Sequence, residues 1–166
     1  MDLYLVRHAI AESASSSGRD ADRALTADGK GKMRRAAQGL RELDVRLDLI
    51  LASPYRRAVE TAEILASVLG GLDTRVLPEL AAGAEVVPLL AALRPYRHLE
   101  ALALVGHQPD LGIFASQIAT GSPSACPLAF KKGAVACFAI PEPRNSLRGD
   151  LVWFMTPKQL RAVRAD

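Results

Sequence analysis

The chain has 166 residues, close to the roughly 150 that are usual for one domain, so the sequence predicts a single domain over residues 1–166. Apolar residues make up 49% of the chain and charged residues 23%, a composition that excludes a mostly disordered protein. The formal net charge is only +3 and the basic residues are scattered, so no nucleic-acid partner is expected. The mild positive excess is compatible with an anionic substrate.

The sequence indicates neither secretion nor a membrane partner. Asp2 stands where a secretory signal carries basic residues, and the apolar run that follows is short. The longest uncharged stretch, residues 111–130, is interrupted by glycines and prolines and is unlike a bilayer span. Cys126 and Cys137 could pair, but two buried reduced thiols are the commoner outcome. We therefore expect a soluble, cytoplasmic protein.

The chain begins with a short apolar run, residues 3–6, which we predict to be a buried strand ending at Arg7 and His8. Residues 11–22 are rich in serine and charge and predict a loop. Thr26 can then cap a helix, because the apolar residues that follow recur with helical spacing at positions 33, 36, 37 and 40.

Two further apolar runs predict buried strands. Residues 47–52 end at Ser53, which we expect to cap a helix that has Pro54 as its first residue and a Gly-Gly pair at its end. Residues 101–105 end at Gly106 and His107, before a helix predicted over residues 110–118. The remaining predicted elements of this part are a strand at 74–77 and a helix at 85–93.

The last third of the chain has a different pattern. Residues 133–140 and 151–155 predict a hairpin, because Pro141, Pro143 and Gly149 lie between them. Pro157 is expected to open a short terminal helix.

Alternating strands and helices predict an α/β fold, a three-layer α/β/α sandwich with a mainly parallel central sheet. Ligands of such sheets bind beyond the carboxyl ends of the strands. Three of the predicted strands are followed at their carboxyl ends by a polar or ionisable residue, in the pairs Arg7–His8, Ser53–Pro54 and Gly106–His107. The sequence therefore predicts the functional site at this edge of the sheet.

Several common catalytic motifs are absent from the sequence. It contains no G-x-x-x-x-G-K-[ST] phosphate loop, no G-x-S-x-G nucleophile elbow, and no arginine six residues after either cysteine. The three histidines do not have the spacing of a transition-metal site, so no metal is expected.

His8 and Arg7 form the first candidate pair. Taken alone, such a pair is more often structural or solvent-exposed. In a functional site, neutral imidazole can attack phosphorus because its ordinary pKa is about 6.5, and guanidinium binds phosphate oxygens in a planar, bidentate manner. His107 gains weight from its equivalent strand end, whereas His98 lies in a polar stretch and is expected at the surface.

Arg57 is expected in the first turn of the helix that follows residues 47–52. The free N–H groups and the dipole of a helix N-terminus favour an anion there, and a guanidinium on the same side would reinforce them. Arg56 beside it is expected to be solvated.

These residues fall in four segments: LVRHA, with Arg7 and His8; LTADGKGKMRRAA, from Leu25; SPYRRAVETA, from Ser53; and VGHQP, from Val105. In this order the segments resemble the motifs of the histidine phosphatase superfamily, also called the phosphoglycerate mutase-like family. The third motif selects Arg57 over Arg56. The short chain is most similar to the SixA-type phosphohistidine phosphatases, a branch without the long insertions that form a lid in mutases.

The resemblance implies a phosphoglycerate mutase-like fold and a phosphatase that needs no metal or cofactor, with His8 as nucleophile. It also implies that Arg7, Arg57 and His107 bind the phosphoryl oxygens, His107 being at least partly protonated beside the phosphate. Many members carry an acidic residue after the third strand, which places Glu79 as a possible general acid; the weaker candidates are Glu12 and Asp110. A phosphate or sulfate ion is expected in the same pocket.

The sequence leaves the substrate open. Without a lid the site should be accessible, which favours phosphohistidine on a phosphotransfer-type protein. A small phosphomonoester, such as a sugar phosphate or a nucleotide, is the alternative substrate. A non-catalytic phosphate-binding module is a hypothesis of another class, which the presence of all four phosphate-contacting residues disfavours. Mutase activity is not expected, because no insertion is available to retain an intermediate.

Overall fold

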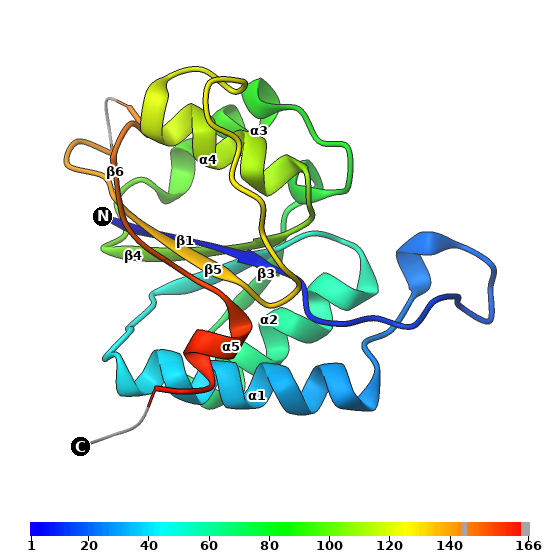
Figure 1. Cartoon of the computed structure of the whole chain (residues 1–166). Coiled ribbons are helices and arrows are strands. Elements are labelled where there is room, and N and C mark those ends of the chain that lie inside the picture. Colours follow the sequence, from blue (N-terminus) through cyan, green and yellow to red (C-terminus); the bar gives the residue numbers. More distant parts are fainter. Residues whose placement is uncertain (144–145, 164–166) are drawn as a thin grey trace.

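The computed structural model describes residues 1–143 and 146–163, which form a six-stranded sheet between two layers of helices (Figure 1). The strands are β1 (Asp2–Arg7), β2 (Leu49–Ala52), β3 (Thr74–Val76), β4 (Ala101–Gly106), β5 (Val135–Ala139) and β6 (Asp150–Met155). Their order is β3-β2-β4-β1-β5-β6, in which the first four are parallel and the last two antiparallel. The predicted α/β fold with a mainly parallel sheet is confirmed.

Five α-helices cover the two faces of the sheet: α1 (Ala27–Glu42), α2 (Arg56–Val68), α3 (Val86–Ala92), α4 (Asp110–Thr120) and α5 (Pro157–Leu160). One face is covered by α1, α2 and α5, and the other by α3 and α4 (Figure 1). Three short 3-10 turns complete the described elements: η1 (Asp20–Asp22), η2 (Pro78–Leu80) and η3 (Arg94–Tyr96).

The central strands are buried on both sides, as their uninterrupted apolar runs require. In β1, Leu3 and Leu5 pack with α3 and α4, while Tyr4 and Val6 pack with α1 and α2. This alternation follows from the two-residue period of a strand, and it gives the sheet two separate apolar cores.

Two predicted helix starts are confirmed by their hydrogen bonds. The Thr26 hydroxyl accepts from the backbone N–H of Gly29 at 2.8 Å, which caps α1. Pro157 is the first residue of α5, and Thr156 and Gln159 form a reciprocal capping box around it.

The start of α2 differs from the prediction. The helix begins at Arg56, and its N-cap is Tyr55, so Ser53 and Pro54 lie before it. The Ser53 hydroxyl accepts from the backbone N–H of Tyr55 at 3.2 Å and is fully buried against His107. Ser53 therefore does not cap the helix, because its hydroxyl is engaged by the histidine at the end of β4.

The antiparallel end of the sheet confirms the predicted hairpin, whose connecting loop includes residues 144–145 outside the described part of the chain. Cys137 is buried in β5, as expected, but Cys126 is exposed, and the two thiols are not joined. The expectation was wrong for Cys126 because its segment, between α4 and β5, runs over the surface with prolines on both sides. No helix of the described residues is long and apolar enough to cross a bilayer.

Candidate active site

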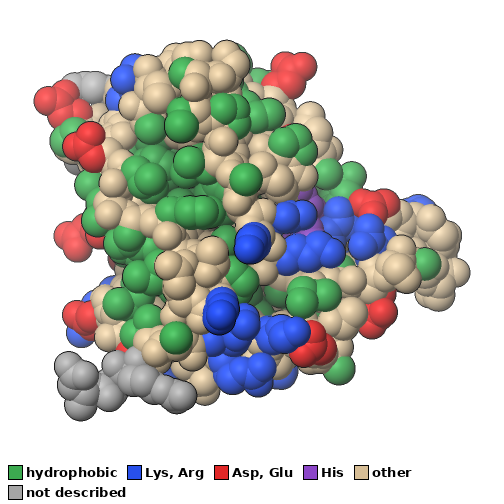
Figure 2. Space-filling view, in the orientation of Figure 1, with side chains coloured by type: hydrophobic (Ala, Val, Ile, Leu, Met, Phe, Trp, Pro, Cys, Tyr) green, Lys and Arg blue, Asp and Glu red, His purple; other side chains and the backbone are tan. Residues whose placement is uncertain are grey.

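The register of the parallel strands brings the candidate residues to one edge of the sheet. Arg7 pairs with Gly106 across β1 and β4, and Ala52 pairs with Val105 across β2 and β4. His8 therefore follows β1, His107 follows β4 and Ser53 follows β2. All three lie at neighbouring carboxyl ends of the sheet. Figure 2 shows lysine and arginine side chains gathered around a histidine in this region.

His8 is held in the tautomer that leaves Nε2 unprotonated. The residue is only 5% exposed, and Nδ1 lies 2.7 Å from the carbonyl oxygen of Ala9. A carbonyl only accepts, so Nδ1 carries the proton and Nε2 keeps its lone pair. Nε2 lies 3.3 Å from Nε of Arg57, which can only donate.

Helix α2 fixes the segment that follows β1. The backbone N–H of Ala9 donates to the Thr61 hydroxyl at 3.1 Å, and this hydroxyl donates to the carbonyl oxygen of Arg57 at 2.6 Å. Thr61 is fully buried. Thr61 therefore anchors both Ala9, whose carbonyl orients His8, and Arg57, which contacts Nε2 of His8.

His107 faces His8 from the end of β4. The centroids of the two rings are 5.2 Å apart, and Nδ1 of His107 lies 3.5 Å from Nη2 of Arg57. On its other side, Nε2 lies 2.7 Å from the Ser53 hydroxyl. The Tyr55 ring meets the imidazole edge-on, with centroids 4.9 Å apart, and confines it from a third direction.

Arg57 lies in the first turn of α2, as predicted, and it contacts both histidines. Its guanidinium also donates to Asp20, through Nη1 to the carbonyl oxygen at 2.7 Å and through Nη2 to the carboxylate at 2.9 Å. The guanidinium lies 4.8 Å from the centre of the Tyr55 ring. Arg56, in contrast, is exposed and pairs with Glu60 at 2.9 Å, which confirms the expectation for it.

Asp20 was not found by sequence reasoning. It lies in η1, within the loop expected at residues 11–22, and hydrogen bonds from Arg23 and Arg57 lower the pKa of its carboxyl group. Nothing in the sequence separates Asp20 from the other acidic residues of this loop.

The Arg7 guanidinium has a hydrogen-bonded Nη1 and an Nε that lacks an acceptor among the described residues. Its Nη1 donates to the carbonyl oxygen of Phe130 at 2.6 Å, whereas its buried Nε has no hydrogen-bond acceptor among the described residues. A buried donor without an acceptor is unfavourable, and an oxyanion would satisfy it.

Gln108, also not found by sequence reasoning, holds the carbonyl that Arg7 uses. Its side-chain oxygen accepts from the N–H of Phe130 at 3.3 Å, and its amide nitrogen donates to the carbonyl oxygen of Leu128 at 3.1 Å. The residue that follows His107 thus fixes the guanidinium that precedes His8. The VGHQP motif contains Gln108, so a sequence signal for this residue was available. Its contact with residues 128–130 is tertiary and leaves no pattern in the sequence.

Both site histidines are neutral at physiological pH in this arrangement. Burial lowers the pKa of His8 to about 3, and the charges of Arg57 and Arg7 act in the same direction. Burial, followed by the charge of Arg57, lowers the pKa of His107 to about 4. The expected partial protonation of His107 thus depends on a bound oxyanion, whose charge would raise this pKa.

The three acidic candidates occupy different places. Glu79, half-buried in η2, lines a small hollow together with His107 and Asp110. The Asp110 carboxylate accepts from the N–H of Gly83 at 2.9 Å. Glu12 is exposed in the loop before η1, and its carbonyl oxygen accepts from Arg23. Glu79 is therefore the acidic candidate that lies beside His107 with no carboxylate hydrogen bond described.

The third histidine, His98, lies away from the candidate site, and the described residues do not form the grouping that a metal ion needs. His98 is exposed after η3, as expected, with Nδ1 at 2.8 Å from the carbonyl oxygen of Pro95. Within residues 1–143 and 146–163, no three His, Cys, Asp or Glu side chains are grouped to hold a metal ion.

Comparison with known proteins identifies the class. Residues 3–82 match the model of the histidine phosphatase superfamily (branch 1). An uncharacterised protein of Picosynechococcus sp. is 41% identical over 123 residues, which are 73% of this chain and 74% of that protein. The chain belongs to the histidine phosphatase superfamily.

Within the superfamily the chain is of the SixA type. It is 27% identical over 168 residues to the phosphohistidine phosphatase SixA of Escherichia coli, with 99% of both chains covered. A solved structure of the protein histidine phosphatase SixA complexed with tungstate superposes with a TM-score of 0.85 at 27% identity, covering 96% of this chain and 99% of that one. These relatives make the protein a phosphatase of the hydrolase class.

Proposed function

We propose that the protein hydrolyses phosphohistidine carried by another protein, through a phosphohistidine intermediate on its own His8 and without a metal ion. The observation that carries this proposal is the fixed tautomer of His8. Its Nδ1 proton is held by the carbonyl of Ala9, so its Nε2 lone pair faces Arg57 and His107. A neutral, oriented imidazole among cationic donors is suited to attack a phosphoryl group.

In the first step, Nε2 of His8 attacks the phosphorus in line. An Nε2–P bond forms as the P–N bond to the substrate histidine breaks. Arg57 and the free Nε donor of Arg7 bind the oxygens in the plane of transfer, and His107 joins them once the phosphoryl charge has favoured its protonation. These charges take the part that a metal ion plays in other phosphoryl-transfer sites.

The departing imidazole has to receive a proton on the nitrogen that leaves phosphorus. Glu79 is the proposed donor, because it lies in the hollow beside His107. In the second step, a water molecule attacks the phosphoenzyme and gives one proton back to the Glu79 carboxylate, the P–N bond at His8 breaks, and orthophosphate leaves. The His8 imidazole is then neutral again and ready for the next substrate.

Two observations favour a protein substrate. The relatives named as SixA align with nearly the whole chain. In addition, residues 77–85 connect β3 to α3 with only the η2 turn among them, so no inserted helix from this connection covers the strand ends. A site that no such helix covers admits the side chain of a folded protein more readily than it encloses a metabolite.

A substrate comparison tests the proposal against the small-phosphomonoester hypothesis. Initial rates are measured on a phosphohistidine peptide and on a panel of sugar phosphates and nucleotides, with His8→Ala as background and with EDTA in a parallel series. We expect the highest kcat/KM on the phosphohistidine peptide, no effect of EDTA, and no turnover by His8→Ala. A higher kcat/KM on a small phosphomonoester would contradict the proposed protein substrate and support the small-phosphomonoester hypothesis. EDTA-sensitive hydrolysis by His8→Ala would overturn the mechanism.

A further inference from the structure

A turn that contacts the end of β1 places two lysines close in space to the segment of His8. The backbone N–H of Gly133 donates to the carbonyl oxygens of Arg7 at 3.1 Å and His8 at 3.2 Å. Gly133 has φ of 82°, a conformation that glycine adopts readily. The exposed residues just before it, Lys131 and Lys132, are thereby placed next to the reacting histidine.

From Lys132 a row of basic residues continues away from the site. Lys132 lines a hollow of about 160 Å³ together with Ala9, which directly follows His8, and with Lys32 and Arg161. Arg161 also lines a neighbouring hollow of about 250 Å³, with Arg35, Arg41 and Glu42 of α1, of which Arg41 and Glu42 pair at 3.9 Å. We call Lys132, Lys32, Arg161 and Arg35 the basic strip.

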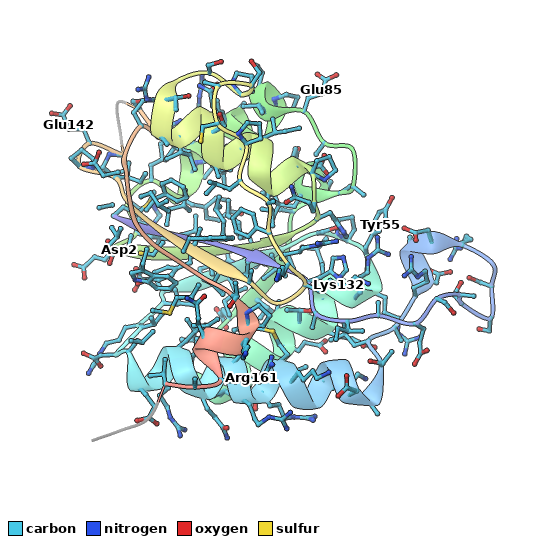
Figure 3. The ribbon with its side chains drawn as sticks, viewed as in Figure 1. Asp2, Tyr55, Glu85, Lys132, Glu142 and Arg161 are labelled. Atoms are coloured by element: carbon cyan, nitrogen blue, oxygen red, sulfur yellow. The ribbon has the colours of Figure 1, made fainter. Side chains whose placement is uncertain are left out.

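The figures show how the folded chain assembles this strip. Figure 3 places Lys132 beside the end of the sheet and Arg161 at the end of α5, which lies over α1. Figure 2 shows one group of basic side chains next to the histidine and another below it, in the region of α1 and α5. Three segments distant in sequence therefore contribute to one basic surface.

Most of this charge is uncompensated within the described chain. Lys132, Arg161 and Arg35 have no carboxylate within 4.0 Å among residues 1–143 and 146–163. Lys32 pairs with Asp28 at 2.7 Å, and this pair is solvent-exposed, so it reduces the field of the strip only in part. The strip thus presents a positive surface that starts beside His8.

We infer that the basic strip docks an acidic surface adjoining the phosphohistidine of the partner protein, an inference that rests on the proposed function. In the proposed mechanism Arg7, Arg57 and His107 bind the single phosphoryl group, so it does not need cations along α1 and α5. A protein with carboxylates beside its phosphohistidine would meet both the site and the strip. Complementary charge of this kind accelerates association and selects the partner.

The test compares three substrates that share the same scissile P–N bond. They are free phosphohistidine, a synthetic phosphohistidine peptide flanked by glutamates, and the same peptide with glutamines in their place. The strip variant is Arg35→Glu with Arg161→Glu. The matched control is Arg46→Glu with Arg75→Glu, which changes the formal charge equally at two exposed residues outside the strip.

For the strip variant at low salt, we expect kcat/KM on the glutamate peptide to fall about tenfold, and to approach that of the control at high salt. Its kcat/KM on free phosphohistidine should stay within about twofold of the unmodified protein, because Arg35 and Arg161 lie outside the reacting site. The control variant should keep the preference for the glutamate peptide.

Other outcomes overturn the inference in distinguishable ways. Equal losses in the strip and control variants would show a general effect of net charge rather than docking at the strip. Equal kcat/KM on the glutamate and glutamine peptides would show that no acidic surface is recognised. Failure of the unmodified protein to hydrolyse any of the three substrates would instead contradict the proposed function.

Discussion

At the residue scale, Arg57 is shared among three partners, the two neutral site histidines and the Asp20 carboxylate. Its guanidinium faces the two histidines and at the same time donates to Asp20. The Asp20 carboxylate brings a negative charge to a site proposed to bind an oxyanion. It therefore holds Arg57 in place but opposes the binding of phosphate by charge.

The substitution Asp20→Asn separates these two effects. Asn keeps an oxygen acceptor for Arg57 and removes the charge, so inorganic phosphate or tungstate should bind about threefold more tightly. Competitive inhibition constants measure the change, with Asp22→Asn as control, because Asp22 lies in the same turn but pairs with Arg19 at 2.7 Å. Weaker oxyanion binding by Asp20→Asn would show that the carboxylate acts mainly by positioning Arg57.

Sequence reasoning identified the four residues that meet at the strand ends, because each stands in a recognisable motif or after an apolar run. It did not identify Asp20 or Gln108. Asp20 meets Arg57 across 37 positions of the chain, and Gln108 meets Phe130 across 22. Such contacts depend on how loops fold back on the sheet, which local patterns do not encode.

At the element scale, the segment between α4 and β5 supports Arg7. It passes so close to α4 that a Cβ at Gly112 would overlap the carbonyl oxygen of Leu128. Two residues later, Phe130 supplies the carbonyl that holds the Arg7 guanidinium. The packing of this segment on α4 is therefore coupled to the geometry of the site.

Gly112→Ala tests this coupling. The added methyl group should push the segment off α4, destabilise the fold by about 2 kcal/mol and lower kcat/KM through Arg7. Gly31→Ala is the matched control, because the nearest atom to a Cβ there is 3.9 Å away and alanine favours helix by about 1 kcal/mol. Urea unfolding and steady-state rates measure both effects; a Gly112→Ala variant as stable and active as the original would refute the coupling.

The elements themselves were predictable because strands and helices follow from apolar periodicity and capping residues. The start of α2 was not, since the Ser-Pro pair has the pattern of a helix start while its serine hydroxyl hydrogen-bonds His107. A tertiary hydrogen bond overrode a local preference there. The exposure of Cys126 was not predictable either, because the path of its segment over the surface is set only in the folded protein.

At the scale of the whole molecule, the net charge of +3 conceals a local concentration of basic residues. The basic strip draws on α1, α5 and the turn before Gly133. The sequence presented these cations as scattered, and only the packing of α5 on α1 brings them together. Composition alone therefore could not predict a docking surface.

The buried histidines also make the stability of the fold depend on pH. In the folded protein the pKa values of His8 and His107 are about 3 and 4, below the ordinary value of 6.5. As the pH falls below 6.5, the unfolded chain takes up protons that the folded chain does not, so the free energy of unfolding decreases.

Between pH 7 and pH 5, this effect should lower the free energy of unfolding by about 2 kcal/mol for each of the two histidines. Urea unfolding at the two pH values measures the loss, which His107→Gln should reduce by about half. Saturating tungstate should also reduce it, because a bound oxyanion favours protonation of His107. Equal stability at pH 7 and pH 5 would contradict the neutral state of these histidines.

The central claim is that His8 forms a covalent bond to phosphorus while the groups around it hold the oxygens. The most direct measurement is to quench a reaction with a phosphohistidine peptide in alkali and to locate the phosphoryl group on the chain by peptide mapping. The account predicts an acid-labile phosphoryl group on His8 alone, absent from His8→Ala. Turnover without a phosphoenzyme, or a phosphoryl group on another residue, would contradict it.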